Sequence, residues 1–277
     1  MSEGPRAIRR MAVEASKAAA AAVDALRPRR HGIVMLLYHR VGATQQVQMN
    51  LETEVFVRQI ETIASRGVVD LASALELLER EETAVSIDPT VVTFDDGTTD
   101  FVDVVLPVLV QHRVPVTLYL ATDHIERQLA FPYDGRPLSW SSLRDALETG
   151  LVTIGSHTHT HALLDRIASP DAEQELRRSI TLIEDRLGVH PEHFAYPKAI
   201  AGSPANEQLV QRYFRSAAIA GTRANRYGRT DVHRLARSPI QAADGMRWFE
   251  RKLGGGMRLE DDLRRLANRR RYAGARS

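Results

Sequence analysis

Residues 91–121 read VVTFDDGTTDFVDVVLPVLVQHRVPVTLYLA and contain a predicted strand, a helix and a second strand in one run. The strands cover 91–94 and 115–121, and the helix between them covers 100–113. Apolar runs without alternation are typical of strands that are covered on both faces. Two adjacent aspartates follow the first strand, and because like charges repel, a nearby positive charge is expected to balance them.

The same alternation extends along most of the chain. Further strands are predicted at 33–38, 151–157, 193–197, 216–221 and 233–240, and further helices at 51–67, 71–80, 139–150, 170–188 and 203–214. This order predicts an α/β protein with a parallel sheet wrapped by helices, as either a barrel or a doubly wound sheet. In both architectures, catalytic residues collect at the carboxyl ends of the strands.

Composition describes an ordinary globular protein of 277 residues, with 43% hydrophobic and 26% charged residues. The absence of cysteine excludes disulfides and thiolate metal sites, so any metal must be held by histidine and carboxylate side chains. The net charge is only +2, but arginines gather in the tail at 246–277. Such a tail could contact phosphates, an anionic lipid surface or an acidic partner, or could simply be a solvated helix end.

The N-terminus is predicted to form an amphipathic helix over residues 6–27. Glu14, Lys17 and Asp24 interrupt its apolar residues, so it does not resemble a secretory signal. No stretch approaches the roughly 18 consecutive apolar residues of a membrane span. The expected location is cytoplasmic or peripheral to a membrane, with membrane contact through the basic segments at both ends as a hypothesis.

A histidine-rich stretch, IGSHTHTHALL, contains His157 and His161. Residues four apart on a helical turn project from one face, so both imidazoles could bind the same ion. Two imidazoles and one carboxylate are a common site for zinc or a similar ion, although a plain surface turn would have the same sequence. Either Asp95 or Asp96 could supply the carboxylate, and the other could take a proton from metal-bound water.

The motifs TFDDG (93–97) and SHTHTH (156–161) together resemble the polysaccharide deacetylase family, also called the NodB-homology family or carbohydrate esterase family four. The resemblance extends over about residues 32 to 245. It implies a distorted β/α barrel of about seven parallel strands and metal-dependent removal of N- or O-acetyl groups. The implied metal is zinc, with cobalt, nickel and manganese as alternatives. The implied partner is an N-acetylated carbohydrate, with no specific nucleic acid. Together with the two terminal segments described above, the resemblance divides the chain into an N-terminal amphipathic helix at 1–30, a polysaccharide deacetylase domain at 31–245 and a basic helical tail at 246–277.

The resemblance also implies roles for single residues. Asp95 matches the general base, and Asp96, His157 and His161 match the metal ligands. Tyr196 matches the position whose backbone N–H helps to hold the developing oxyanion.

Two family features are missing. The third motif lacks the arginine that braces the base, and Arg237 stands where a late histidine would act as general acid. Arg237 could fill the space of that partner or bind an anionic group of the substrate. Some relatives take the acid from a Tyr-His pair after an early strand, which makes His39 the preferred general acid and His233 the reserve. Trp140 and Tyr133 are candidate rings for stacking against sugars.

Three functions remain open at this point. The first is a metal-dependent carbohydrate deacetylase. The second keeps the metal site but hydrolyses an amide or formamide of a small, nucleotide-linked or lipid-linked sugar. The third is a barrel that binds glycan without catalysis, which the paired aspartates and paired histidines argue against.

Overall fold

The computed structural model describes most of the chain. The described residues are 17–19, 21, 22, 24, 31–45, 47–80, 88–257 and 259. Most of the N-terminal helix predicted over residues 6–27, and the end of the basic tail at 246–277, therefore lie outside them. Among the described helices, none is long and apolar enough to cross a lipid bilayer.

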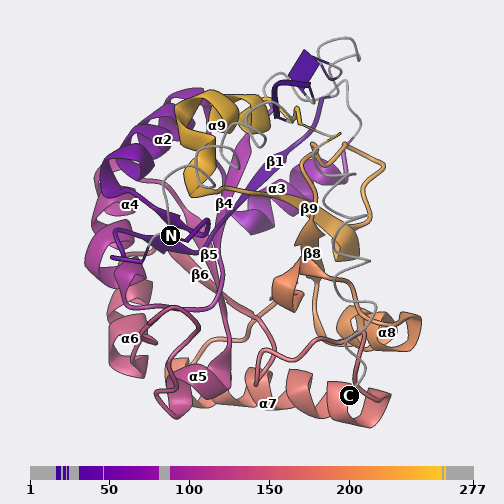
Figure 1. Ribbon diagram of the computed structural model, residues 1–277. Coiled ribbons are helices and arrows are strands. Elements are labelled where there is room, and N and C mark those ends of the chain that lie inside the picture. The colour runs from indigo at the N-terminus through magenta and orange to yellow at the C-terminus, as the bar shows by residue number, and fades with distance from the viewer. Residues whose placement is uncertain are drawn as a thin grey trace, which may run out of the picture.

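The centre of the molecule is a closed barrel of parallel strands in the order β1-β4-β5-β6-β7-β8-β9 (Figure 1). These strands are β1 Val34–Tyr38, β4 Thr90–Phe94, β5 Val116–Leu120, β6 Val152–Ser156, β7 His193–Ala195, β8 Ser216–Ala220 and β9 Leu235–Pro239. The ring closes where β9 pairs with β1, with Leu36 opposite Ser238. The prediction of an α/β barrel with about seven parallel strands is confirmed, and the doubly wound alternative is wrong.

The strands of the barrel do not pair equally. β5 and β6 pair along their whole length, from Val116 opposite Val152 onward. β6 and the short strand β7 pair only where Ser156 lies opposite Phe194 in this fully described part of the chain. The β6–β7 boundary is therefore the most weakly hydrogen-bonded seam of the barrel.

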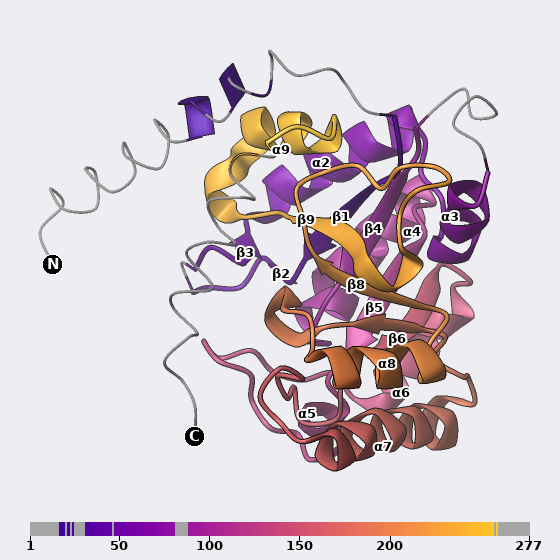
Figure 2. The same ribbon diagram turned by 90° about the vertical axis from the view of Figure 1, so that its right-hand side faces the viewer.

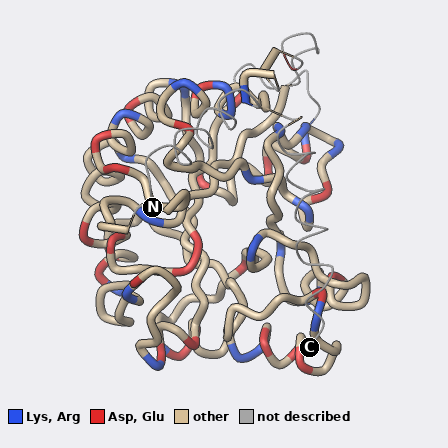
Figure 3. The backbone as a smooth tube through the Cα atoms, in the orientation of Figure 1, with Lys and Arg blue, Asp and Glu red and all other residues tan. Residues whose placement is uncertain are grey.

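Helices cover the outside of the barrel. They are α2 Thr53–Arg66, α3 Leu71–Leu78, α4 Leu106–His112, α5 Thr122–Glu126, α6 Trp140–Glu148, α7 Ser169–Leu187, α8 Pro204–Tyr213 and α9 Gly245–Leu253. α7 and α8 pack together on one side, whereas α9 lies with α2 on another (Figure 1, Figure 2). Charged residues of both signs are interspersed along these helices and the loops (Figure 3).

Three short elements were not predicted from the sequence. They are α5 and the small parallel sheet of β2 Arg40–Val41 and β3 Asn50–Leu51. Elements of two to five residues are too short to show a hydrophobic period. The predicted helix at 100–113 also begins differently, as a π-helical turn, Phe101–Val105, before α4. Pro107 has no N–H to donate four residues back, which disfavours a regular α-helical start there.

Side chains alternate between the inside and the outside of the barrel. Met35, Val91 and Tyr119 belong to an inner cluster that also contains Ala218 of β8 and side chains of α3. Leu36 and Phe94 belong to the outer cluster that packs against the helices. Residues of the inner parity that follow the strands therefore meet at the rim of the barrel.

The N-terminal segment is attached to the barrel by a buried ionic group. Asp244 accepts hydrogen bonds from Lys17 (2.6 Å) and from Lys252 of α9 (2.8 Å). All three residues are buried, each at most 2% exposed. Burial would raise the pKa of Asp244, but the two ammonium groups bring it below its usual value. Lys17 thus belongs to the packed structure of the domain.

Candidate active site

The two aspartates lie where β4 ends at the rim of the barrel. The Asp95 N–H still donates to the Tyr38 carbonyl, which continues the β1–β4 ladder. Asp96 then adopts a left-handed conformation (φ 78°), which aspartate tolerates better than most residues. Gly97 follows with φ 93°, and a side chain there would lie 2.9 Å from Leu120. This turn points both carboxylates toward the centre of the rim.

Asp96, His157 and His161 form a group that we call the cation cluster. One donor atom from each residue lies within 4.8 Å of the others. The Asp96 Oδ1 atom is 3.9 Å from His157 Nε2 and 3.6 Å from His161 Nε2. Among the described residues this is the one such group of three or more potential ligands.

A hydrogen bond fixes the tautomer of His157. Its Nδ1–H donates to the Ala195 carbonyl at 2.7 Å, because a carbonyl can only accept. The Nε2 atom therefore carries the lone pair and faces Asp96. Histidines that bind metals commonly have this kind of support at the other ring nitrogen.

His161 is also suited to act as a neutral ligand. Burial, together with the neighbouring His157, lowers the pKa of His161 to about 4. The imidazole is therefore uncharged at neutral pH. Two neutral imidazoles and one carboxylate suit zinc and similar divalent ions, so the residues present fit a divalent cation.

Residues 157–161, here called the histidine turn, do not form a helix. The prediction that helical spacing would bring His157 and His161 together is therefore wrong. Their rings do meet, with centroids 5.0 Å apart. The chain reverses instead at Thr158 (φ 64°) and His161 (φ 61°). Both have a left-handed backbone conformation, which is uncommon for residues other than glycine. Strained backbone of this kind clusters at functional sites.

Arg237 on β9 binds Asp95 past β1, the one strand that lies between β9 and β4. Its Nη1 and Nη2 atoms donate to Asp95 Oδ1 (2.6 Å) and Oδ2 (2.9 Å), and Nη1 also donates to the Thr93 hydroxyl. The guanidinium lies 5.0 Å from the ring centroid of Tyr119. Of the two roles considered for Arg237, the structure shows the one in which it replaces the missing partner. Because it is fully buried, it is not available to bind an anionic group of a substrate.

This pairing determines the ionisation of Asp95. Burial alone would raise the pKa of Asp95, but Arg237, and to a smaller extent His157 and His39, bring it below its usual value. Asp95 is therefore a carboxylate at neutral pH. Its Oδ2 atom lies 3.8 Å from His157 Nε2, beside the cation cluster. A carboxylate in this position can accept a proton from a water held at the cluster.

The two candidates for general acid are at opposite ends of the barrel. His39 directly follows β1, is half-buried, and is close enough for its charge to influence Asp95. His233 precedes β9, and its Nε2 bonds to the Phe214 carbonyl (2.9 Å). Because the amino ends of the strands lie away from the rim, His233 cannot serve as the reserve acid.

Two groups that were expected to contact the substrate are hydrogen-bonded within the protein instead. The Tyr196 N–H donates to the Ala218 carbonyl at 3.1 Å within the barrel, so this amide is already occupied and does not fit the expected oxyanion role. The Trp140 indole N–H donates to Glu126 at 2.7 Å, and its ring packs against the outer cluster. Trp140 therefore supports helix packing and is not a sugar platform.

Tyr133 is presented at the surface by a loop that the sequence did not explain. Its side chain is 57% exposed, although its backbone is left-handed (φ 59°). The buried guanidinium of Arg40 donates to the Tyr133 carbonyl (2.8 Å) and to the Pro132 carbonyl (2.6 Å). The sequence did not predict this role of Arg40, although its position directly after His39 indicated that it lies near the rim.

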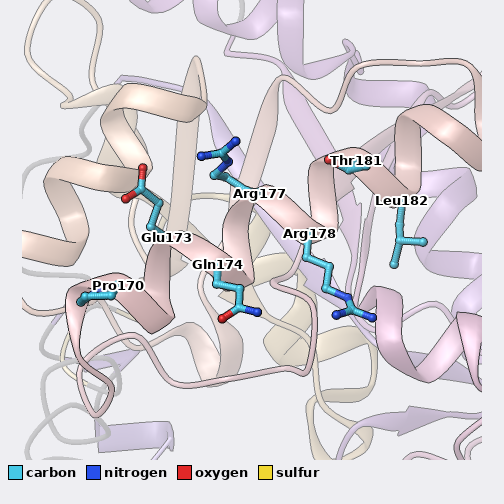
Figure 4. Close-up of a pocket in the computed structure, with 7 residues that line it drawn as sticks. All are labelled: Pro170, Glu173, Gln174, Arg177, Arg178, Thr181 and Leu182. Atoms are coloured by element: carbon cyan, nitrogen blue, oxygen red, sulfur yellow. The ribbon is translucent and has the colours of Figure 1, made fainter.

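The structure also has a surface hollow of about 620 Å³ along α7 (Figure 4). The described residues that line it are Pro170, Glu173, Gln174, Arg177, Arg178, Thr181 and Leu182. They form one stripe of a single helix and include no member of the cation cluster. The hollow is therefore separate from the candidate active site.

A barrel with paired aspartates and a histidine cluster at its rim is suited to bind a divalent cation beside a second carboxylate. The family model described as polysaccharide deacetylase matches residues 84–213 of this chain. A search of curated proteins returned no match.

Several solved structures share the fold. IcaB from Ammonifex degensii is 21% identical, with a TM-score of 0.66 over 81% of this chain and 98% of that chain. The deacetylase PplD from Streptococcus pyogenes, in complex with acetate, is 17% identical, with a TM-score of 0.70 over 81% and 99%. A de-N-acetylase from Aggregatibacter actinomycetemcomitans is 16% identical, with a TM-score of 0.65 over 80% and 99%. At these identities the likeness establishes the fold.

Proposed function

We propose that this protein is a cation-dependent hydrolase that removes acetyl groups from an N-acetylated carbohydrate. The observation that carries the proposal is the pairing of Asp95 with Arg237 directly beside the cation cluster. That pairing keeps a buried carboxylate ionised 3.8 Å from a histidine of the cluster. A protein that only bound glycan would have no use for a second carboxylate at this place.

The proposed chemistry is hydrolysis of the acetamide C–N bond. A divalent ion, most suitably zinc, would be held by Asp96, His157 and His161 and would supply Lewis-acid activation. Asp95 accepts the proton of the attacking water, and water oxygen forms the new bond to the acetyl carbon. His39 donates a proton to the departing nitrogen. The products are acetate and a free amine on the sugar.

Tyr133 supports a carbohydrate as the substrate. An exposed, flat aromatic ring suits the C–H face of a pyranose, and the Arg40 bonds to two loop carbonyls hold its backbone in place. An aromatic ring carried on a backbone held in this way could contact a sugar unit next to the one that reacts. We therefore propose an oligomeric glycan in preference to a single small amide.

The test measures acetate release from N-acetylglucosamine oligomers of increasing length. Chelated protein should be inactive, and adding back zinc or cobalt should restore activity. Asp95→Asn should lower kcat by about 10²–10⁴-fold, the usual contribution of a general base. Asp103→Asn, an exposed aspartate in the turn before α4, is the matched control and should retain full activity.

The outcomes separate the three candidate functions. Activity that rises with chain length supports the glycan deacetylase. Activity on simple amides or formamides that does not depend on chain length would favour the small-substrate hydrolase. Stoichiometric cation with no hydrolysis of any of these substrates would favour a binding protein and contradict the proposal.

A further inference from the structure

The histidine turn is held by hydrogen bonds to its own backbone. On one side, the N–H of Asp123 in α5 donates to the His159 carbonyl at 2.8 Å. The His159 ring points away from the cation cluster, where Nδ1 bonds to the Thr122 hydroxyl (2.9 Å) and Nε2 lies 3.4 Å from Asp123. Helix α5 thus fixes the carbonyl side of the turn.

Glu175 fixes the amide side of the turn from α7. Its Oε2 accepts from the His159 N–H (3.0 Å) and from the Thr160 N–H (2.7 Å). Its Oε1 accepts from the Thr160 hydroxyl (2.8 Å). All three bonds are made to an ionised group, and bonds of this kind are stronger than those between neutral partners.

The next residue along the chain is the cation ligand His161. Its left-handed backbone is unfavourable for a residue with a β-carbon and persists only when the surroundings hold it there. Glu175 bonds to the two preceding residues, so its carboxylate holds the amide side of the chain in this reversal. Without it, the two amides would need new acceptors and the turn could relax.

The geometry points to Glu175 as a positioning residue that sets the affinity of the cation cluster by holding His161 in place. Glu175 does not touch the cluster and acts only through the backbone of the turn. This inference rests on the proposed function, because it takes His161 to be a cation ligand. It adds a residue on α7 that neither motif contains.

The test compares Co²⁺ binding in the full-length protein and in Glu175→Ala and Glu175→Gln, by calorimetry and by the visible spectrum of the bound ion. Glu175→Ala should weaken binding by about 10- to 100-fold, the usual effect of removing support behind a metal ligand. Glu175→Gln keeps an oxygen for the two amides and should recover most of the affinity. In the metal-free protein, NMR should show changed amide proton shifts for His159 and Thr160 in the alanine variant.

Glu173→Ala is the matched control on the same helix. Its carboxylate accepts a hydrogen bond from the Tyr213 hydroxyl and makes no bond to the histidine turn. Wild-type affinity in Glu175→Ala, unchanged amide shifts, or an equal loss in Glu173→Ala would each overturn the inference alone. Wild-type protein that binds no Co²⁺ would overturn this inference together with the proposed function.

Discussion

Arg237 stands where the resemblance to the family led us to expect a histidine, and the chemistry of the two side chains differs. A guanidinium stays charged at any pH relevant to the protein and offers parallel donors that match a carboxylate. Arg237 therefore cannot donate a proton to a leaving group, but it can hold Asp95 ionised and oriented. Arg237 therefore braces Asp95 from β9, and a general acid would have to be another residue.

Arg237→Lys should separate charge from geometry. The lysine keeps a positive charge but loses the two parallel bonds to Asp95, so we expect kcat for acetate release to fall by about 10- to 100-fold, the worth of one charged hydrogen bond. KM should change little, because Arg237 does not face the substrate. Arg237→Met should instead lower the free energy of unfolding by about 3–5 kcal/mol, because Asp95 is left buried and unpaired. Equal kcat for wild type and Arg237→Lys would contradict this role.

The burial of His193 makes the stability of the domain depend on pH. Burial lowers the pKa of His193 to about 4, from 6.5 in the unfolded chain. The unfolded chain therefore takes up the proton first, so this contribution to stability is complete above pH 6.5 and is lost as the pH falls through 4. The loss is on the order of 3 kcal/mol.

Urea unfolding at pH 7 and pH 4, with wild type and His193→Asn, measures this contribution. The variant should lose less stability between the two pH values, because asparagine does not titrate. NMR of the folded protein should show the His193 ring neutral down to about pH 4. A ring that titrates near pH 6.5 would contradict the argument.

At the scale of elements, a glycine on β6 makes room for a side chain of the neighbouring strand β5. A side chain at Gly155 would lie 2.5 Å from the ring of Tyr119 on β5 and 2.9 Å from the His193 carbonyl on β7. Glycine at this position therefore lets Tyr119 lie flat beneath the guanidinium of Arg237. β6, which His157 directly follows, thus also makes room for the group that orients Asp95.

Gly155→Ala should lower the free energy of unfolding by about 3 kcal/mol, at the upper end of the usual cost of overpacking. Gly254→Ala is the control, because a β-carbon there would meet nothing closer than 3.5 Å. In a double-mutant cycle, Tyr119→Leu should relieve part of the Gly155→Ala loss, since the ring is one of the two clashing groups. Strict additivity of the two changes would rule out this explanation.

The sequence predicted the regular elements well because its strands are continuous apolar runs and its helices have clear periodic faces. Predicted ends differ from the observed ends by a residue or two, as at β4, where 91–94 became Thr90–Phe94. Residue type and strand order also indicated the cation cluster. The errors have a different origin. The left-handed histidine turn, the occupied amide of Tyr196 and the direction of Trp140 depend on backbone angles and partners distant in sequence.

At the scale of the whole molecule, the buried group of Asp244, Lys17 and Lys252 joins the N-terminal segment to the end of the barrel. The group carries two positive charges and one negative charge. Removing the carboxylate leaves two buried ammonium groups without a negative partner, whereas removing Lys17 leaves the ion pair of Asp244 with Lys252. The two changes should therefore have unequal effects.

Asp244→Asn should lower the free energy of unfolding by about 3–5 kcal/mol, the cost of leaving buried charge unpaired. Lys17→Met should cost only about 1 kcal/mol, because its aliphatic chain is kept and Asp244 retains Lys252. Urea midpoints for the two variants measure the difference. A loss in Lys17→Met as large as in Asp244→Asn would mean that the lysine, and not the carboxylate, holds the segment.

The seam between β6 and β7 has a consequence for the motions of the native state. The hydrogen bond from His157 Nδ1 to the Ala195 carbonyl crosses this seam. A member of the cation cluster therefore also helps to hold β6 and β7 together. Amide hydrogens of β7 should exchange with deuterium sooner than those of β5, because local opening begins where few bonds hold. A bound cation should slow that exchange most at the seam and least at β1 and β4, since it binds the closed form only. A cation bound at the cation cluster would then also stabilise the β6–β7 seam.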